Sequence, residues 1–274
     1  MKDVILDTIV DSLKLLPFLF ITLFIIQLTS HKMDGRSEGI LKSSKKVGPL
    51  LGGLFGLIPQ CGFSVMATNL YVSRVITLGT LISVYLATSD EMIPIFISHE
   101  ASVGIILKIL LIKFIIGTVW GFIIDRIITI KSSDSVDMEK LQEEHCHRGI
   151  FVESLVHTLK IFAFILVISF ALNVIMYAKG NEVLSNIFMN NKVFGVMLSS
   201  VIGMIPNCSA SVLMCEFYFN DVISFGSMMA GLLCGSGASL LVLFKENKRF
   251  KENIGIILIL FLIGFTSGLI IDLI

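Results

Sequence analysis

One short motif occurs twice in the chain, each time inside a long apolar run. The first copy is 57–64 (Leu-Ile-Pro-Gln-Cys-Gly-Phe-Ser) and the second is 204–211 (Met-Ile-Pro-Asn-Cys-Ser-Ala-Ser). Proline removes a backbone donor and small residues let the chain bend, so each motif predicts an interrupted helix. Because hydrocarbon cannot satisfy the backbone groups that are freed, interrupted helices at membrane depth usually line a cavity.

The two motifs belong to a repeat that covers most of the chain. Pro206 lies 147 residues after Pro59, and the same ungapped shift pairs further identical residues. An internal duplication of this kind is typical of membrane transporters. The identical pairs are Pro59 and Pro206, Cys61 and Cys208, Ser64 and Ser211, Tyr71 and Tyr218, Gly79 and Gly226, Ser89 and Ser236, Gly117 and Gly264, Gly121 and Gly268, and Asp125 and Asp272.

The composition predicts an all-α, polytopic protein of the cytoplasmic membrane. Of the 274 residues, 55% are hydrophobic and 15% are charged, against about 25% charged in a soluble domain. Apolar runs such as 15–28 and 254–271, extended by flanking apolar turns, approach the roughly 20 residues that span a bilayer. Acidic residues at positions 3, 7 and 11 are unlike the basic start of a cleavable signal peptide, so we expect the first helix to be retained.

The lysines and arginines predict that the two halves have opposite orientations in the membrane. Segment 32–46 is basic, whereas its counterpart 177–192 has only two lysines. The reverse holds for 98–102, which has no basic residue, and its counterpart 245–251, which has four. Cytoplasmic segments are the basic ones. Basic turns that change places between the halves therefore indicate an inverted repeat.

An inverted repeat requires an odd number of crossings in each half. Residues 47–71 are too few for two full spans at 1.5 Å per residue, so they predict a re-entrant hairpin bent at Pro59. Residues 75–97 and 103–128 then cross the membrane. Each half is predicted to contain three transmembrane helices plus one re-entrant helical hairpin, ten helical elements in all. Lys108 and Lys113 are placed near the external end of the last span, against the charge pattern.

The predicted organisation is two repeats joined by a short linker: residues 1–130, a cytoplasmic polar linker over 131–148, and residues 149–274. The linker contains His145, Cys146 and His147. Imidazole and thiolate suit zinc-like ions, so this cluster is a candidate metal site. The alternative is a solvated linker without a ligand.

The two motifs supply the candidate substrate site. Amide oxygens, hydroxyls and thiolates together suit a transition metal, and thiolates alone suit a trivalent metalloid. Alternatively, the cysteines and serines are only small residues that let helices pack closely. The candidate residues are Gln60, Cys61 and Ser64 in the first motif and Asn207, Cys208, Ser209 and Ser211 in the second.

A further interruption is predicted in the third apolar segment of each half, at 87–91 and 234–238, and both should face the hairpin tips. The first contains Asp90 and Glu91, which suit a divalent cation or proton coupling if they lie in the membrane; otherwise the span ends at Ser89 and they are solvated. The second contains the flexible Gly235 and Gly237. Four nearby methionines, Met204, Met214, Met228 and Met229, are either soft-metal ligands or gap-filling packing residues.

No motif in the sequence predicts an enzyme. The chain contains no HExxH, no P-loop and no glycine-rich nucleotide fingerprint. We expect no cofactor and no nucleic-acid partner; a metal ion would be the substrate. Without a nucleotide-binding domain, transport must be driven by an ion gradient, a potential or the gradient of the substrate. The cysteines are expected to be free thiols.

The doubled motif and the polar linker resemble the family of ten-helix heavy-metal exporters, described also as manganese transporters or arsenic efflux proteins and similar to arsenical permeases. This resemblance implies a secondary transporter that exports a transition metal or metalloid, with a divalent cation such as manganese favoured. Two alternatives stay open: an anion carrier with re-entrant hairpins, and a membrane binding or assembly protein that transports nothing. Homo-oligomer formation is not decided by the sequence.

Overall fold

The computed structural model describes residues 37–58, 61–89, 92–127, 192–206 and 208–273, together with Phe20, Leu159 and Ala163. The described residues form α-helices and no β-strand. In the first half the helices are α2 (Ser37–Gly56), α3 (Cys61–Val72), α4 (Leu78–Ala87), α5 (Met92–Ser98) and α6 (Val103–Ile127). In the second half they are α9 (Lys192–Gly203), α10 (Cys208–Phe219), α11 (Phe225–Cys234), α12 (Ser239–Glu246) and α13 (Phe250–Leu273). The linker 131–148 lies outside the described residues.

The helices repeat along the chain in the register that the sequence predicts. Helices α3 and α10, and likewise α4 and α11, begin and end 147 residues apart. The turn that follows α3 contains Arg74 with a φ of 57°, and the turn that follows α10 contains Asp221 with the same φ. Non-glycine residues rarely adopt this left-handed conformation. Its recurrence at paired positions shows that the two halves share local backbone geometry as well as helix order.

An aspartate near the end of each long helix holds the start of a buried helix. The Asp125 carboxylate of α6 accepts hydrogen bonds from the Thr77 hydroxyl (2.6 Å) and from the Gly79 N–H (2.8 Å). In the second half the same two bonds, 2.6 and 2.8 Å long, join Asp272 of α13 to the start of α11. The first N–H groups of a helix have no partner within the helix and favour negative charge. Each aspartate supplies a hydrogen-bond acceptor and a negative charge to the start of the buried helix.

Paired glycines allow these helices to cross at backbone contact. A Cβ atom added to Gly121 of α6 would lie 2.8 Å from the carbonyl oxygen of Gly79 in α4. A Cβ atom added to Gly268 of α13 would lie 2.8 Å from the carbonyl oxygen of Gly226 in α11. Small residues at crossings let membrane helices gain van der Waals contact that larger side chains would prevent.

The helices form a buried centre and an apolar outer layer. Every residue of α4 is buried, and so are Gly226–Cys234 of α11. Helices α6 and α13 pack against α4 and α11 respectively and carry exposed apolar side chains such as Leu111, Ile115 and Leu258. Exposed apolar surface on this scale fits a lipid environment. Four described segments are long and apolar enough to cross a membrane: Leu78–Ser98, Val103–Ile127, Phe225–Glu246 and Phe250–Leu273.

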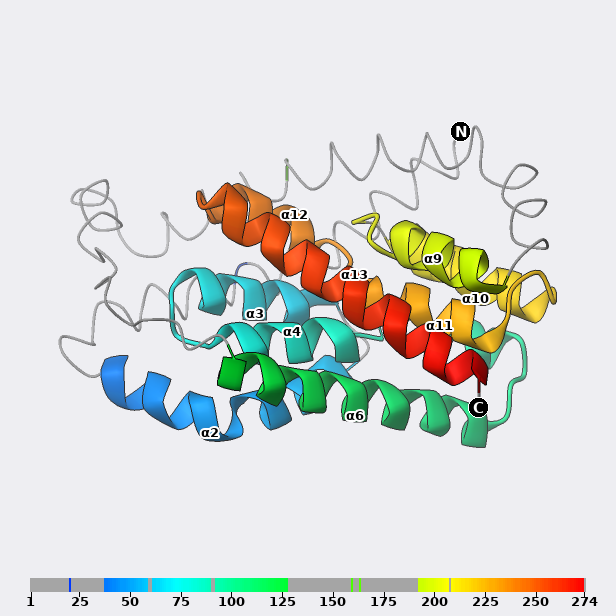
Figure 1. Cartoon of the computed structure of the whole chain (residues 1–274), viewed down its shortest axis with the longest axis horizontal. Helices are drawn as coiled ribbons and strands as arrows, with labels where there is room; N and C mark the ends of the chain where they lie inside the picture. The colour runs from blue at the N-terminus through cyan, green and yellow to red at the C-terminus, as the bar shows by residue number, and fades with distance from the viewer. Residues whose placement is uncertain are drawn as a thin grey trace.

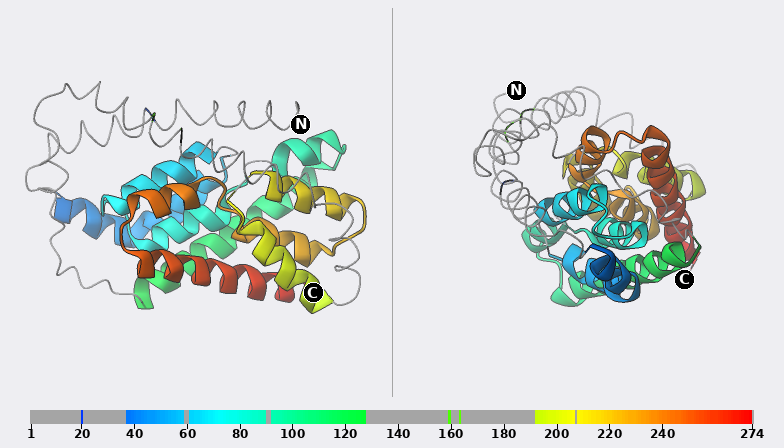
Figure 2. Two further views of the ribbon diagram at one scale, coloured as in Figure 1. Left: turned by 90° about the horizontal axis from the view of Figure 1, so that it is seen from above. Right: turned by 90° about the vertical axis from the view of Figure 1, so that its left-hand side faces the viewer.

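The long helices α6 and α13 run in opposite directions, and the two halves contact each other through α3, α5, α10 and α12. Figure 1 shows α6 and α13 running oppositely along the long axis, with α2 and α9 entering from opposite ends. Helix α12 of the second half packs against α3 of the first, and α5 of the first packs against α10 of the second. Figure 2 shows the same arrangement from two other sides, with α12 beside α3 and α5 beside α10.

The sequence-based boundary of the second helix was wrong at its beginning. The polarity of segment 32–46 predicts a loop, but residues 37–46 belong to α2. Lysine, serine and glutamate are compatible with a helix, so their polarity marks where the helix leaves the apolar layer and not where it starts. The predicted boundaries of α6 agree with the structure to within a residue.

Candidate functional site

Both Ile-Pro-amide-Cys motifs interrupt a helix, as the sequence predicts. Helix α2 ends at Gly56 and α3 begins at Cys61; α9 ends at Gly203 and α10 begins at Cys208. Pro206 lies in the bend between the second pair, half-buried. Five candidate residues in or beside the breaks lie outside the described residues: Pro59, Gln60, Asp90, Glu91 and Asn207. The side chains of Cys61, Cys208 and Ser209 lie outside them as well.

The third segment of each half is also interrupted where the sequence predicts. Helix α4 ends at Ala87 before α5 begins, and α11 ends at Cys234 before α12 begins. The second break contains Gly237, whose φ of 54° lies in the left-handed region that favours glycine. These breaks leave carbonyl oxygens at the ends of α4 and α11 without a partner inside their helices.

In each half the motif packs beside this second interruption. A Cβ atom on Gly56 would lie 2.8 Å from the Cβ of Ala87, the last residue of α4. A Cβ atom on Gly235, directly after α11, would lie 3.2 Å from the Ser211 hydroxyl and 3.6 Å from the Gly203 carbonyl oxygen. Ser211 is half-buried here. The predicted interruptions of one half therefore lie together.

A chain of hydroxyl groups links the first motif to the opposite half. The Thr68 hydroxyl donates to the carbonyl oxygen of Ser64 (2.8 Å) and bonds the Tyr85 hydroxyl (2.6 Å). Tyr85 also bonds Ser239 of α12, which donates to the carbonyl oxygen of Ser236. The hydroxyl group of Ser236 is buried and has no hydrogen-bond partner among the described residues. Such an orphan is unusual, because buried polar groups are normally paired.

Lys113 is the residue that the sequence reading misplaced. It was assigned to the external end of a span, but it lies near the middle of α6 with a side chain that is 0% exposed. Its ammonium donates to the carbonyl oxygen of Thr88, directly after α4, and to that of Leu232 in the last turn of α11 (3.0 Å). The repeat places Leu260 at the equivalent position. A lysine far from both ends of an apolar run is a sequence signal for a functional site.

Two thiols of the second half lie near the lysine. Cys215 of α10 and Cys234 of α11 are buried free thiols, and both are close enough for the Lys113 charge to act on them. Met214, Met228 and Met229 are fully buried in the same hydrophobic cluster. Within the described residues, no three metal-ligating His, Cys, Asp or Glu side chains gather. Whether these methionines bind a soft metal or only fill space stays a prediction, and His145, Cys146 and His147 lie outside the described part of the chain.

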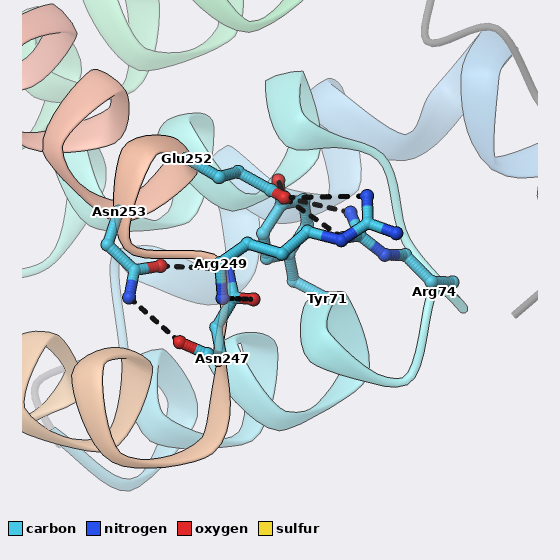
Figure 3. Close-up of polar contacts among 6 residues, drawn as sticks. All are labelled: Tyr71, Arg74, Asn247, Arg249, Glu252 and Asn253. Atoms are coloured by element: carbon cyan, nitrogen blue, oxygen red, sulfur yellow. Dashed lines mark hydrogen bonds and ion pairs between the residues drawn. The ribbon is translucent and has the colours of Figure 1, made fainter. Parts of the chain in front are cut away.

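Polar contacts join the halves at one end of the molecule, where the turns after α3 and α12 meet (Figure 3). Arg74 donates to both oxygens of Glu252 (2.9 and 3.0 Å), and the Tyr71 hydroxyl donates to the same carboxylate. The side chains of Asn247 and Asn253 bond each other (2.8 Å) beside this group. Hydrogen bonding to Glu252 raises the pKa of Arg74 although its partial burial opposes this. The guanidinium is therefore charged at neutral pH.

A second contact between the halves lies where the turns after α5 and α10 approach. The His99 ring is 3.0 Å from the Glu216 carboxylate and stacks on Phe219, with ring centres 4.2 Å apart. Both polar side chains are more exposed than the Arg74 and Glu252 pair, at 35% and 42% against 23% and 22%. Neither contact was predicted, because pairing between turns of different halves depends on how the repeats dock.

Comparison with known families accounts for the whole chain. The model of a family described as "Putative, 10TM heavy-metal exporter" matches residues 1–178 and 147–274. No curated protein and no solved structure matches the chain.

Proposed function

Because the chain belongs to the family of ten-helix heavy-metal exporters, we propose that it is a secondary transporter that exports a transition-metal or metalloid species from the cytoplasm by alternating access. A divalent cation such as manganese is the favoured cargo. The observation that carries the proposal is the convergence of interrupted helices from both halves on one buried point, where Lys113 bonds the ends of α4 and α11. Convergent helix breaks at membrane depth are typical of transporter binding sites.

The proposed architecture is a pair of inverted repeats, each with three spans and one re-entrant hairpin. The described apolar parts of the hairpin arms, Val47–Gly56, Val193–Gly203 and Ala210–Phe219, are short. At 1.5 Å per residue each reaches about half of a roughly 30 Å bilayer core. The opposite directions of α6 and α13 in Figure 1 support the inversion. The cross-contacts of α3 with α12 and of α5 with α10 support it as well, because each joins turns predicted to lie on the same membrane side.

The proposed cargo site lies between the two motifs. Cys61 and Cys208 are the soft ligands, and Gln60, Asn207, Ser64, Ser209 and Ser211 are the candidate oxygen ligands. Asp90 and Glu91, in the break after α4, supply negative charge for a cation. Ser211 of the second motif packs against the break after α11. This contact supports a site to which both the motif and the break contribute.

Transport by the purified protein in liposomes tests this proposal. We expect efflux of at least one member of a panel of Mn²⁺, Zn²⁺, Co²⁺, Cd²⁺ and arsenite. Replacing both motif cysteines (Cys61→Ser with Cys208→Ser) should abolish flux of the soft members of the panel, because hydroxyls bind soft ions far less well than thiolates. Cys146→Ser tests the linker cluster separately: unchanged flux would leave the motif cysteines as the thiol ligands of the cargo. Absence of flux for the whole panel in the unmodified protein would contradict the proposal and favour a membrane assembly protein.

An anion carrier is the second candidate, and one feature favours it. Helices α3 and α10 both begin at the motif cysteines, and the free N–H groups of a helix N-terminus attract anions. The buried Lys113 ammonium adds positive charge. Liposome flux of phosphate or arsenate without flux of any metal cation would favour this candidate.

A further inference from the structure

The Lys113 ammonium lies where the interrupted helices of both halves end. It bonds the carbonyl oxygens of Thr88, from the first half, and of Leu232, from the second. We call these two oxygens the carbonyl cradle. Both lie at the ends of helices, which carry partial negative charge. The cradle is therefore a set of neutral oxygen atoms suited to a cation.

Packing alone does not explain a lysine at this position. The repeat-related position is occupied by Leu260, which is also fully buried. A lysine at the centre of a membrane helix costs about 2.5–3.5 kcal/mol relative to an apolar residue. Because the equivalent helix α13 packs with a leucine at this position, packing of α6 does not require the lysine charge. The ammonium is better explained by the oxygens that it contacts.

The side chain is also suited to leaving the cradle. Lysine places a compact cation on a flexible four-carbon stem, so its charge can move by several ångströms without movement of α6. Among the described residues, Cys215 of α10 and Cys234 of α11 are ionisable groups on which the Lys113 charge acts. Asp90 and Glu91, which follow Thr88 in the sequence, lie outside the described residues.

We propose that the carbonyl cradle is a cation-binding site whose occupant in this state is the chain's own Lys113, and that a cargo cation takes the place of the ammonium. The proposal rests on the proposed function, since it assumes a cationic cargo. The ammonium acts as a tethered competitor: it fills the cradle when no cargo is present and weakens cargo binding until it moves aside. Hard cations such as Mn²⁺ accept carbonyl oxygens as ligands.

Binding of radiolabelled Mn²⁺ to the detergent-purified full chain, measured by equilibrium dialysis, tests the competition. Removing the competitor with Lys113→Met should tighten Mn²⁺ binding at least about tenfold, because two like charges about 4 Å apart repel strongly at low dielectric. Lys113→Arg should retain weak binding. The matched control is Lys108→Met, an exposed lysine on the same helix, which should leave binding unchanged. Unchanged or weaker binding by a folded Lys113→Met protein would overturn the proposal and indicate that Lys113 has only a structural role.

Chemical rescue supplies a readout that does not depend on the methionine variant. Lys113→Ala leaves space for a small amine, so millimolar methylammonium should fill the cradle and reverse the tightened Mn²⁺ binding. Failure of methylammonium to compete would also overturn the proposal. Both experiments measure binding. They therefore test whether the carbonyl cradle binds a cation even if liposome flux contradicts the proposed transport function.

Discussion

At the scale of single residues, Arg74 and Glu252 connect the turn after α3 to the second half of the chain. The contact is bidentate and mostly shielded from water, with Tyr71 donating to the same carboxylate. Charge-assisted pairs of this geometry are among the stronger hydrogen bonds in proteins. The His99 and Glu216 contact joins the halves at a more exposed place, where solvent weakens ion pairs.

A double-mutant cycle of Arg74→Gln and Glu252→Gln should therefore show a coupling free energy of about 1–3 kcal/mol. The measurement is unfolding of the detergent-purified protein, followed by intrinsic fluorescence. The same cycle for His99→Gln and Glu216→Gln is the control and should give less than about 1 kcal/mol. Equal couplings for the two pairs would show that exposure does not govern the strength of these contacts.

At the scale of helices, close crossing of glycine-bearing segments positions the buried α4 and α11. In both halves an aspartate from the long helix bonds the start of the buried helix, and one residue pair brings the two backbones together. The crossing sets the depth at which α4 and α11 end. It thereby fixes where their free carbonyl oxygens meet Lys113.

Adding a methyl group at the crossing should destabilise the protein. Gly121→Ala and Gly268→Ala should each cost about 1–3 kcal/mol, because the new Cβ would overlap atoms of the neighbouring backbone that cannot move freely. Gly255→Ala is the matched control on α13, since a Cβ there meets nothing within 4 Å; it should be neutral or slightly stabilising. Thermal unfolding in detergent measures both. Equal stability of the crossing and control variants would refute the close contact.

At the scale of the whole molecule, the proposed inverted repeat predicts opposite accessibility for residues at paired positions. The turn after α3 contains Ser73 and the turn after α10 contains Asn220, 147 residues apart. The proposed topology places the first turn in the cytoplasm and the second outside, because the first lies beside the basic turn after α12.

Single cysteines at these two positions can be labelled in cells with a membrane-impermeant maleimide. In a Cys146→Ser background, Asn220→Cys should react in intact cells, whereas Ser73→Cys should react only after permeabilisation. The parent protein without the added cysteine gives the background signal; Cys215 and Cys234 are buried. Labelling of both positions from the same side would rule out the inverted repeat.

The sequence by itself determined the helical membrane class, the register of the duplication and the four helix interruptions. Each of these depends on local chemistry: proline and small residues break a helix wherever it lies, and apolar length decides what a bilayer accepts. Family membership also followed from the motifs.

The side chains that contact the helix interruptions, and the contacts between the halves, became known from the tertiary structure alone. Lys113 was misplaced because a charge in an apolar run looks the same in sequence whether it snorkels to an interface or bonds a carbonyl. The Arg74 and Glu252 pair was missed because its partners lie 178 residues apart and come together only when the halves dock. Docking depends on side-chain packing between α3 and α12 and between α5 and α10, which periodicity and composition do not encode.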